Sequence, residues 1–298
     1  MAISYRRLAL IAVTVSLIAT CFIIVPPLAQ DPRYHAFADG RTLHGVPNFW
    51  NVISNVPFLL VALYGIKSLR RRVAEAFPVG QTGYSQPIPK AGIGGSPRFA
   101  ARTFIEPWER IACCLLLAGT AAVGVGSTYY HLHPDDARLV WDRLPMTVVF
   151  MSLVAATIGE RVSMKAGRLL LAPMILLGFG AVLCWRYSGD LRPYCIVQFG
   201  SILAMPLMLA RFPPRYSAGG CLWGTVVLYA LAKLVELLDH EIASCLATGG
   251  HPWKHLFAAG AIFLYVSSIA RRRPLGVTAD DTWAAAVALA PLRQGATQ

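Results

Sequence analysis

The run "IACCLLLAGTAAVGVGSTYY" (Ile111–Tyr130) contains no charged side chain. Roughly 18 or more consecutive apolar residues are enough for an α-helix to cross the hydrocarbon core of a membrane. Because lipid offers the backbone no hydrogen-bond partners, such a segment must satisfy its own N–H and C=O groups as a helix. The run therefore predicts a transmembrane helix, and with it an α-helical membrane protein.

Seven other apolar runs along the chain are of the same kind. Together with the first they predict eight transmembrane helices, of which the fourth and fifth in chain order are the shortest. The alternation of polar and apolar residues that is typical of membrane β-barrels is absent from the sequence. The predicted fold class is an all-α membrane protein, with helices at Leu8–Leu28, Phe49–Lys67, Ile111–Tyr130, Leu144–Ile158, Leu169–Trp185, Pro193–Ala210, Cys221–Leu238 and Pro252–Ala270.

The overall composition agrees with a multi-pass membrane protein and argues against a nucleic-acid partner. Of the 298 residues, 56% are hydrophobic and only 14% are charged. The net charge of +12 arises mainly from Lys and Arg residues that fall on one side of the membrane when the N-terminus is placed inside. This distribution follows the positive-inside rule, so it describes topology. It predicts that both termini are cytoplasmic; no protein partner can be predicted from the sequence.

The chain divides into one membrane domain and three simpler segments. Residues 1–30 are predicted to form a retained transmembrane anchor; a cleaved signal peptide is the alternative, because a basic start precedes the apolar stretch. Residues 31–272 form the membrane domain, interrupted at 73–107 by a Gly- and Pro-rich inner loop that is predicted to be flexible. Residues 273–298 form a cytoplasmic tail.

The stretch "GSTYYHLHPDDARLVWD" (Gly126–Asp142) places polar residues where one predicted helix ends and the next begins. Ser127 and His131 are four residues apart, so on a helix they share a face. Asp142 follows eleven residues after the histidine. Polar groups near lipid are costly unless they are paired, bind a metal or take part in chemistry. The stretch is therefore a candidate functional site.

A second stretch, "GGHPWKH" (Gly249–His255), begins the last predicted helix. His251 and His255 are four apart, so both imidazoles point the same way. If they meet His131 at the same membrane face, three imidazoles form a His₃ zinc site, which leaves zinc a fourth position for water. All seven histidines of the chain fall on the predicted outer side: His35, His44, His131, His133, His240, His251 and His255.

Taken together, these residues resemble a known superfamily. Ser-x-x-x-His, an Asp eleven residues on, and His-x-x-x-His on the final helix resemble the signature of the CREST membrane hydrolases. That superfamily includes the alkaline ceramidases, the adiponectin-type receptors and the Per1-like proteins. The stretch "FWNVISN" (Phe49–Asn55) resembles the opening of the first core helix of alkaline ceramidases. The resemblance covers residues 47–272, so the first predicted helix is an addition to the family's seven.

The resemblance implies a seven-helix bundle that holds a catalytic zinc ion through His131, His251 and His255. Asp142 would take a proton from water and later give one to the leaving amine, and Ser127 would donate a hydrogen bond to the developing oxyanion. The implied activity is hydrolysis of the N-acyl bond of ceramide or a related lipid amide to a fatty acid and an amine, at the outer face of the bilayer. A zinc-containing receptor or regulator of the same superfamily is the alternative.

One departure from the family concerns calcium. Alkaline ceramidases carry an acidic cluster and a Glu before the FWN segment, whereas this chain has "FADGRTLHGVPNFWN" (Phe37–Asn51). Asp39 is present, but Arg41 intrudes and Asn48 stands where that Glu would be. Calcium needs several oxygen ligands with adequate negative charge. A calcium site is therefore not predicted, and the exact substrate is left open.

The candidate residues also have structural alternatives. Ser127 can hydrogen-bond a carbonyl of its own helix, and Asp142 can pair with Arg138 or Arg143. For the FWN segment, contacts between helices and contacts to a substrate are both open; the residues concerned are Asn51, Ser54 and Asn55.

Overall fold

The computed structural model describes residues 24–76 and 103–275, and within these ranges all regular secondary structure is helical. The elements in chain order are η1 (Pro32–His35), α2 (Phe49–Ile53), α3 (Val56–Ala76), α4 (Pro107–Leu132), α5 (Asp136–Arg161), α6 (Met164–Ser188), α7 (Arg192–Arg211), α8 (Gly220–Leu237), α9 (Asp239–Ala243) and α10 (His251–Arg271).

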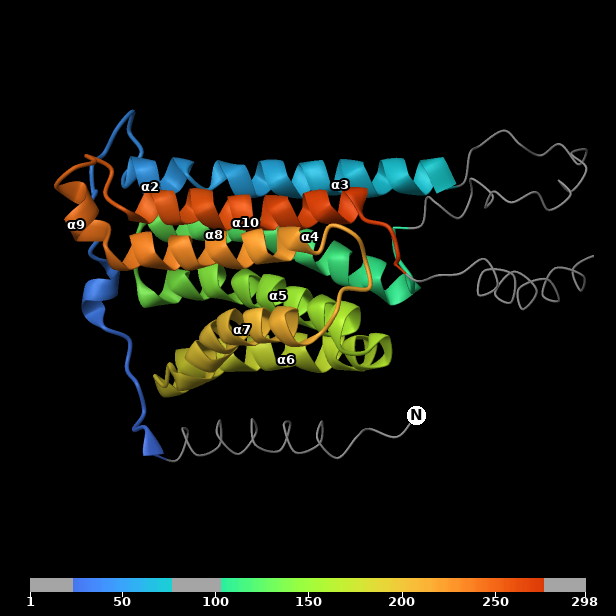
Figure 1. Cartoon of the computed structure of the whole chain (residues 1–298). Helices are drawn as coiled ribbons and strands as arrows, with labels where there is room; N and C mark the ends of the chain where they lie inside the picture. Colours follow the sequence, from blue (N-terminus) through green and yellow to red (C-terminus); the bar gives the residue numbers. More distant parts are fainter. Residues whose placement is uncertain (1–23, 77–102, 276–298) are drawn as a thin grey trace, which may run out of the picture.

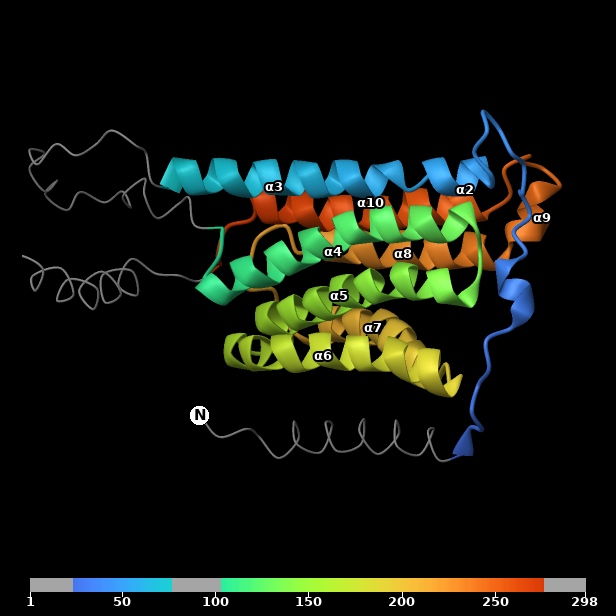
Figure 2. The ribbon, with the colours of Figure 1, turned by 180° about the vertical axis from the view of Figure 1, so that it is seen from behind.

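Seven helical segments within the described ranges are long and apolar enough to cross a membrane; α2 and α3 together form the first of them. They lie side by side along a common direction (Figure 1, Figure 2). α3 packs against α4 and α10, α5 packs against α4, α6 and α7, and α8 packs mainly against α10. Because every long element is a helix, the backbone groups that would face lipid are paired within their own segment.

The all-α fold class is confirmed, and each of the seven later apolar runs coincides with one of the seven long helical segments, although the run Cys221–Leu238 ends one residue beyond α8. The first apolar run, the 73–107 loop and the tail lie largely outside the described residues. The predicted start of the fourth run at Leu144 is wrong, because α5 begins at Asp136. The Asp135 carboxylate accepts a hydrogen bond from the backbone N–H of Arg138 at 2.7 Å and so caps a polar first turn that hydropathy alone does not reveal.

α4 and α5 form an antiparallel pair that approaches closely at Gly126. A Cβ atom at this position would lie 2.0 Å from the carbonyl oxygen of Trp141, so a side chain cannot be accommodated there without moving a helix. The connection between the two helices is only residues 133–135. This close approach brings Ser127 on α4 beside Asp142 on α5.

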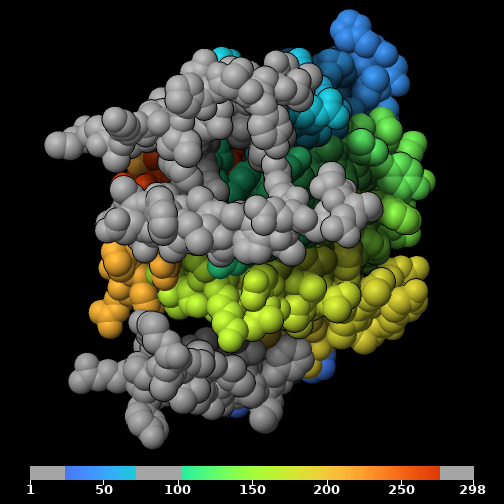
Figure 3. Space-filling view, turned by 90° about the vertical axis from the view of Figure 1, so that its right-hand side faces the viewer, coloured from blue at the N-terminus to red at the C-terminus, as the bar shows by residue number. Residues whose placement is uncertain are grey.

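A buried ion-pair network lies at the end of the bundle away from α9. Arg272, which caps α10, contacts Glu109 of α4 at 3.2 Å and Glu160 of α5 at 3.3 Å. The Tyr216 hydroxyl donates to Glu109 at 2.6 Å, and its ring lies 3.8 Å from the Arg272 guanidinium. Figure 3 views this end, with α3 (cyan) and α6 (yellow-green) on opposite sides. The network joins α4, α5 and α10 through charges that have partners.

The segment before α2 runs across the opposite end of the bundle, near α9 (Figure 1). The backbone N–H of Leu28 donates to the Asp190 carboxylate at 3.3 Å, in the turn between α6 and α7. Gln30 accepts a hydrogen bond from Arg143 of α5 at 2.6 Å. These contacts hold the start of the segment against three helices, and its later residues then cover the site described below.

We predict that Gly126→Ala destabilises the protein by about 2 kcal/mol or more, because its methyl group collides with the backbone of α5. Gly180→Ala is the matched control, because Gly180 is exposed on α6 and a Cβ there has no neighbour within 4 Å. That control should be neutral or slightly stabilising. Thermal unfolding in detergent measures both; equal unfolding temperatures for the two variants would contradict the close approach.

We also predict an acid-dependent contribution from Asp190. The hydrogen bond from the Arg192 side chain lowers the pKa of Asp190 from 3.8 to about 2. A carboxyl group whose pKa is lowered by folding stabilises the folded state above its unfolded pKa, and this contribution is lost as the pH falls toward the folded pKa. The difference in unfolding temperature between wild type and Asp190→Asn should therefore shrink between pH 4 and pH 2. The same comparison with Glu241→Gln, at an exposed position on α9, should show no such trend.

Candidate metal centre

All seven histidines lie at the end of the bundle formed by α2, α9 and the start of α10, which we call the histidine end. Three of them come together: His131 from the last turn of α4, and His251 and His255 from the first two turns of α10. Their ring centroids are 4.9 to 5.0 Å apart. One nitrogen from each ring lies within 4.8 Å of the other two, and each residue is at most 4% exposed. The convergence predicted from spacing is therefore present.

Several nitrogens of this cluster have no hydrogen-bond partner among the described residues. They are both ring nitrogens of His131 and Nε2 of His251. The third ring is oriented by Ser54, whose hydroxyl lies 2.8 Å from Nδ1 of His255. A buried polar atom without a partner costs roughly 1–3 kcal/mol. A metal ion would satisfy one nitrogen of each ring, so the three histidines form a group that could hold one.

Ser127 and Asp142 lie next to this group. Both are buried, and both line the same cavity as His255. The alternative ion pairs of Asp142 are not formed, because Arg138 pairs with Asp135. The guanidinium of Arg143 instead stacks on aromatic rings, the nearest being Trp185 at 4.2 Å. All five residues singled out in the sequence therefore gather in one region.

The start of α10 is positioned by a buried carboxylate that the sequence does not single out. Asp239 Oδ1 accepts hydrogen bonds from the backbone N–H groups of Gly250 and His251, each at 2.7 Å. Its other oxygen accepts from the backbone N–H of Ala38 at 2.9 Å. A negative charge at a helix N-terminus satisfies free donors and favours the helix dipole. Asp239 thus fixes both α10 and the segment that crosses it.

That crossing segment covers the imidazoles. The Phe37 ring lies 4.8 Å from the His131 ring and 4.4 Å from the His251 ring, measured between centroids. At the end of α4, the Asn48 amide donates to the backbone carbonyl of His131 at 2.9 Å. Asn48, which stands where the alkaline ceramidases carry a Glu, therefore helps to hold the end of α4. Asp39 is engaged by Arg41, with a nitrogen-to-oxygen distance of 2.6 Å.

Other polar residues named in the sequence have structural contacts. Asn51 donates to the carbonyl of Asp39 at 3.2 Å, and Asn55 donates to the carbonyl of Asn51 at 2.7 Å. Their side chains therefore fix α2 and the loop before it. His133 is exposed and lies apart from the three clustered rings.

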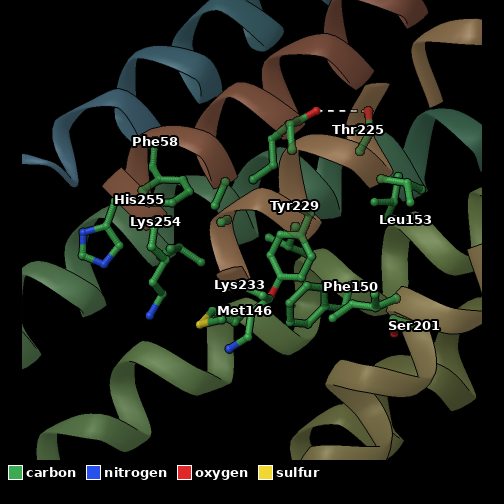
Figure 4. A pocket seen from close by; sticks show the side chains of 18 of the residues that line it. Phe58, Met146, Phe150, Leu153, Ser201, Thr225, Tyr229, Lys233, Lys254 and His255 are labelled. Atoms are coloured by element: carbon green, nitrogen blue, oxygen red, sulfur yellow. Dashed lines mark hydrogen bonds between the residues drawn. The ribbon is translucent and has the colours of Figure 1, made fainter. Parts of the chain in front are cut away.

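Ser127 and Asp142 line a cavity inside the bundle. Most of its lining is apolar and comes from α5, α7, α8 and α10 (Figure 4). Charged side chains line it as well, and Lys233 and Lys254 were not predicted as part of the site. On the sequence, a Lys and a Glu three residues apart on one helix suggest only a local ion pair. The packing of α8 on α10 brings them to the cavity.

We predict that Asp239→Ala destabilises the protein by about 1–2 kcal/mol, because it removes the cap of α10 and the anchor of the crossing segment. Glu241→Ala, at an exposed position on the neighbouring α9, is the matched control and should change little. Thermal unfolding in detergent measures the difference. Equal losses in both variants would show that Asp239 does not act as a cap.

Comparison of the chain with protein-family models and with curated proteins finds no match, so the chemistry of this centre is inferred from its geometry.

Proposed function

We propose that the protein is a zinc-dependent integral-membrane amidase that hydrolyses the N-acyl bond of a lipid amide, ceramide or a related compound, to a fatty acid and an amine. One observation carries the proposal. Three buried imidazoles, two of which have ring nitrogens without a partner among the described residues, lie beside Ser127 and Asp142 in the lining of a mostly apolar cavity within a helical bundle. A metal group with only a structural role would not need such a cavity beside it.

His131, His251 and His255 would hold the metal, and zinc suits a set of three neutral imidazoles. Bound zinc supplies Lewis acidity, which polarises a carbonyl oxygen and makes water acidic enough to lose a proton near neutral pH. Ser54 orients His255 through Nδ1, which is the kind of contact that fixes the tautomer of a ligating histidine.

Asp142 transfers protons in the proposed reaction, and Ser127 stabilises the developing oxyanion. Asp142 accepts a proton from the attacking water and returns one to the nitrogen of the leaving amine, as a general base and then a general acid. Ser127 donates its hydroxyl hydrogen to the carbonyl oxygen as negative charge develops there. In the free protein both side chains are buried in the lining of the cavity, so both are held away from bulk water.

The cavity supplies binding and the exclusion of water. Its apolar lining suits an acyl chain, and each CH₂ group removed from water contributes about 0.8 kcal/mol. The segment that carries Phe37 packs on the imidazoles of His131 and His251 and helps to shield them from water.

The charge distribution supports one orientation in the membrane. The basic residues at the end of the bundle away from the histidines include Arg161, Lys165, Arg211, Arg215 and Arg271. By the positive-inside rule, this end faces the cytoplasm, and the histidine end faces the outer, periplasmic or lumenal side.

The first test is metal content. Purified wild-type protein should contain about one zinc ion per chain, as expected for a single three-histidine site. His251→Ala should lose most of it, because two imidazoles bind zinc far more weakly than three. His133→Ala is the matched control, because this exposed histidine lies only two residues from His131. Elemental analysis of the three proteins measures the outcome; a wild type without bound metal would contradict the proposal.

The second test is turnover. Asp142→Asn should keep the metal but lower the rate of lipid-amide hydrolysis by about 10²–10⁴-fold, because it cannot accept the proton. Ser127→Ala should lower the rate of hydrolysis about 10²-fold, because it removes the hydroxyl group that donates to the oxyanion. Release of labelled fatty acid from ceramide and other N-acyl lipids measures both. Metal-loaded wild type that hydrolyses no acyl amide would instead favour a receptor or regulator.

A further inference from the structure

Three hydroxyl groups lie in the otherwise apolar part of the cavity: those of Ser201, Thr225 and Tyr229. Ser201 donates to the backbone carbonyl of Val197 at 2.6 Å. Thr225 donates to the backbone carbonyl of Ala261 at 3.2 Å, the hydrogen bond drawn in Figure 4. The hydrogens of these two hydroxyl groups are therefore used within the bundle. Tyr229 differs, because the hydrogen bond that it forms is to another side chain with capacity to spare.

Tyr229 of α8 is paired with Gln198 of α7, which is only 6% exposed. The Gln198 Nε2 and Tyr229 hydroxyl oxygen atoms are 3.1 Å apart, and this is the one hydrogen bond that either side chain forms within the described residues. An amide group carries two hydrogens and an acceptor oxygen, and a phenol carries one hydrogen and an acceptor oxygen. Whichever way the amide is turned, a single bond leaves two hydrogens and one oxygen of the pair unused.

The unused groups exceed what a link between two helices needs. One donor and one acceptor are enough to join α7 to α8, as polar side chains commonly do in membrane bundles. Further unpaired polar atoms in an apolar environment are unfavourable. Because Tyr229 lines the cavity, a polar group of a bound molecule can reach the pair and satisfy them.

The pair lies deeper in the bundle than the reacting groups. The Tyr229 and Phe150 rings pack edge to face with their centroids 5.4 Å apart, and Figure 4 shows Tyr229 between Lys233 and Phe150. Phe150 follows Asp142 by eight residues on α5, a rise of about 12 Å away from the histidine end. An acyl chain whose carbonyl lies at Ser127 and Asp142 therefore extends toward the Tyr229 hydroxyl.

A hydroxyl group on that chain matches the pair. It accepts a hydrogen and donates one, so it can use both an unused hydrogen and the unused oxygen. A carbonyl group at the same place could only accept, and a plain hydrocarbon chain could do neither.

We propose that Tyr229 and Gln198 bind a hydroxyl group on the acyl chain, in the half nearer the carbonyl, so that the substrates are lipid amides of hydroxy fatty acids. This inference rests on the proposed amidase function and names its substrate class. Water adds its oxygen to the acyl carbon, the carbon–nitrogen bond breaks, and the nitrogen leaves with the bonding electron pair and takes a proton. The products are a hydroxy fatty acid and an amine. The chain hydroxyl is unchanged, so Tyr229 and Gln198 are binding residues.

The test uses N-palmitoylethanolamine and its 3-hydroxy, 6-hydroxy and 16-hydroxy derivatives with the full chain in detergent. The better of the two internal positions should bind about three- to tenfold more tightly than the plain chain, which is the effect of a typical neutral hydrogen bond. Its kcat/KM should rise by a similar factor. The 16-hydroxy derivative has the same added polarity at the far end and should show no gain. Fatty-acid release measures hydrolysis, and calorimetry on Asp142→Asn measures binding with little turnover.

Variants identify the groups responsible for the preference. Tyr229→Phe removes the hydroxyl group but keeps the ring against Phe150, and it should abolish the preference. The double variant Tyr229→Phe/Gln198→Met removes both partners, so that neither is left unpaired, and should show the same loss. Tyr64→Phe is the matched control, because Tyr64 is exposed on α3 and its loss should leave the preference unchanged. If the Tyr229 variants fail to fold, the wild-type ranking of internal over terminal hydroxyl groups still decides.

The outcomes separate this inference from the proposed function. Hydrolysis of all four amides at equal kcat/KM would overturn the hydroxyl site and leave the amidase standing. A preference in binding that depends on Tyr229, without hydrolysis, would overturn the amidase and leave the hydroxyl site standing. A preference that persists in Tyr229→Phe would overturn the inference. So would a Tyr229→Phe variant that instead loses a preference for N-palmitoylethanolamine over N-palmitoylpropylamine, because the pair would then bind a hydroxyl group on the amine side.

Discussion

A lipid bilayer offers no hydrogen-bond partners, and this constraint accounts for where the polar groups of the protein lie. The buried charged residues and histidines concentrate in two layers near the ends of the helices. One is the histidine end, and the other contains Glu109, Glu160 and Arg272. Between the layers the helices pack through apolar side chains such as Phe58, Leu117 and Val266. Each layer must therefore satisfy its polar groups within the protein.

The two layers meet this requirement in different ways. At the Arg272 end, acids, guanidinium groups and the Tyr216 hydroxyl pair with one another. At the histidine end the pairing is incomplete, because ring nitrogens of His131 and His251 have no partner among the described residues. In the first layer the charged groups have charged partners, whereas in the second two of the buried imidazoles have ring nitrogens without a partner among the described residues. That contrast favours the histidine end as the candidate site.

Most of the helices and the members of the histidine group could be predicted from the sequence. The reason is that a helix crossing a membrane needs a long apolar run. Long apolar runs predict the helices, and four-residue spacing predicts that Ser127 and His131 share a face, as do His251 and His255. The first turns of α5 were missed because hydropathy cannot recognise buried polar residues such as Asp142 and Arg143 as part of a membrane helix. The spacing of the residues predicts which three histidines come together, but not the contacts that hold those histidines in place.

The roles of Asp239, Lys233 and Lys254 could not be predicted from the sequence, because they depend on contacts between segments far apart in the chain. Asp239 caps α10 across eleven residues and also holds Ala38 from the N-terminal segment. Lys233 and Lys254 share Glu236 only because α8 packs on α10. Sequence patterns within one helix carry no information about such neighbours. Residues with a distinctive spacing can therefore be predicted from the sequence, whereas residues whose role comes from packing cannot.

The positions of the three histidines in the chain also determine when, during synthesis, the group can be completed. His131 lies on α4, whereas His251 and His255 lie on α10, the last long helix of the described chain. At usual rates of translation, on the order of ten seconds separate the synthesis of these two helices. Until α10 is inserted, a nascent chain carries one of the three imidazoles, so the metal group cannot be complete. A metal ion could therefore contact all three imidazoles only after α10 is made, and a chain that stops short of α10 lacks two of them.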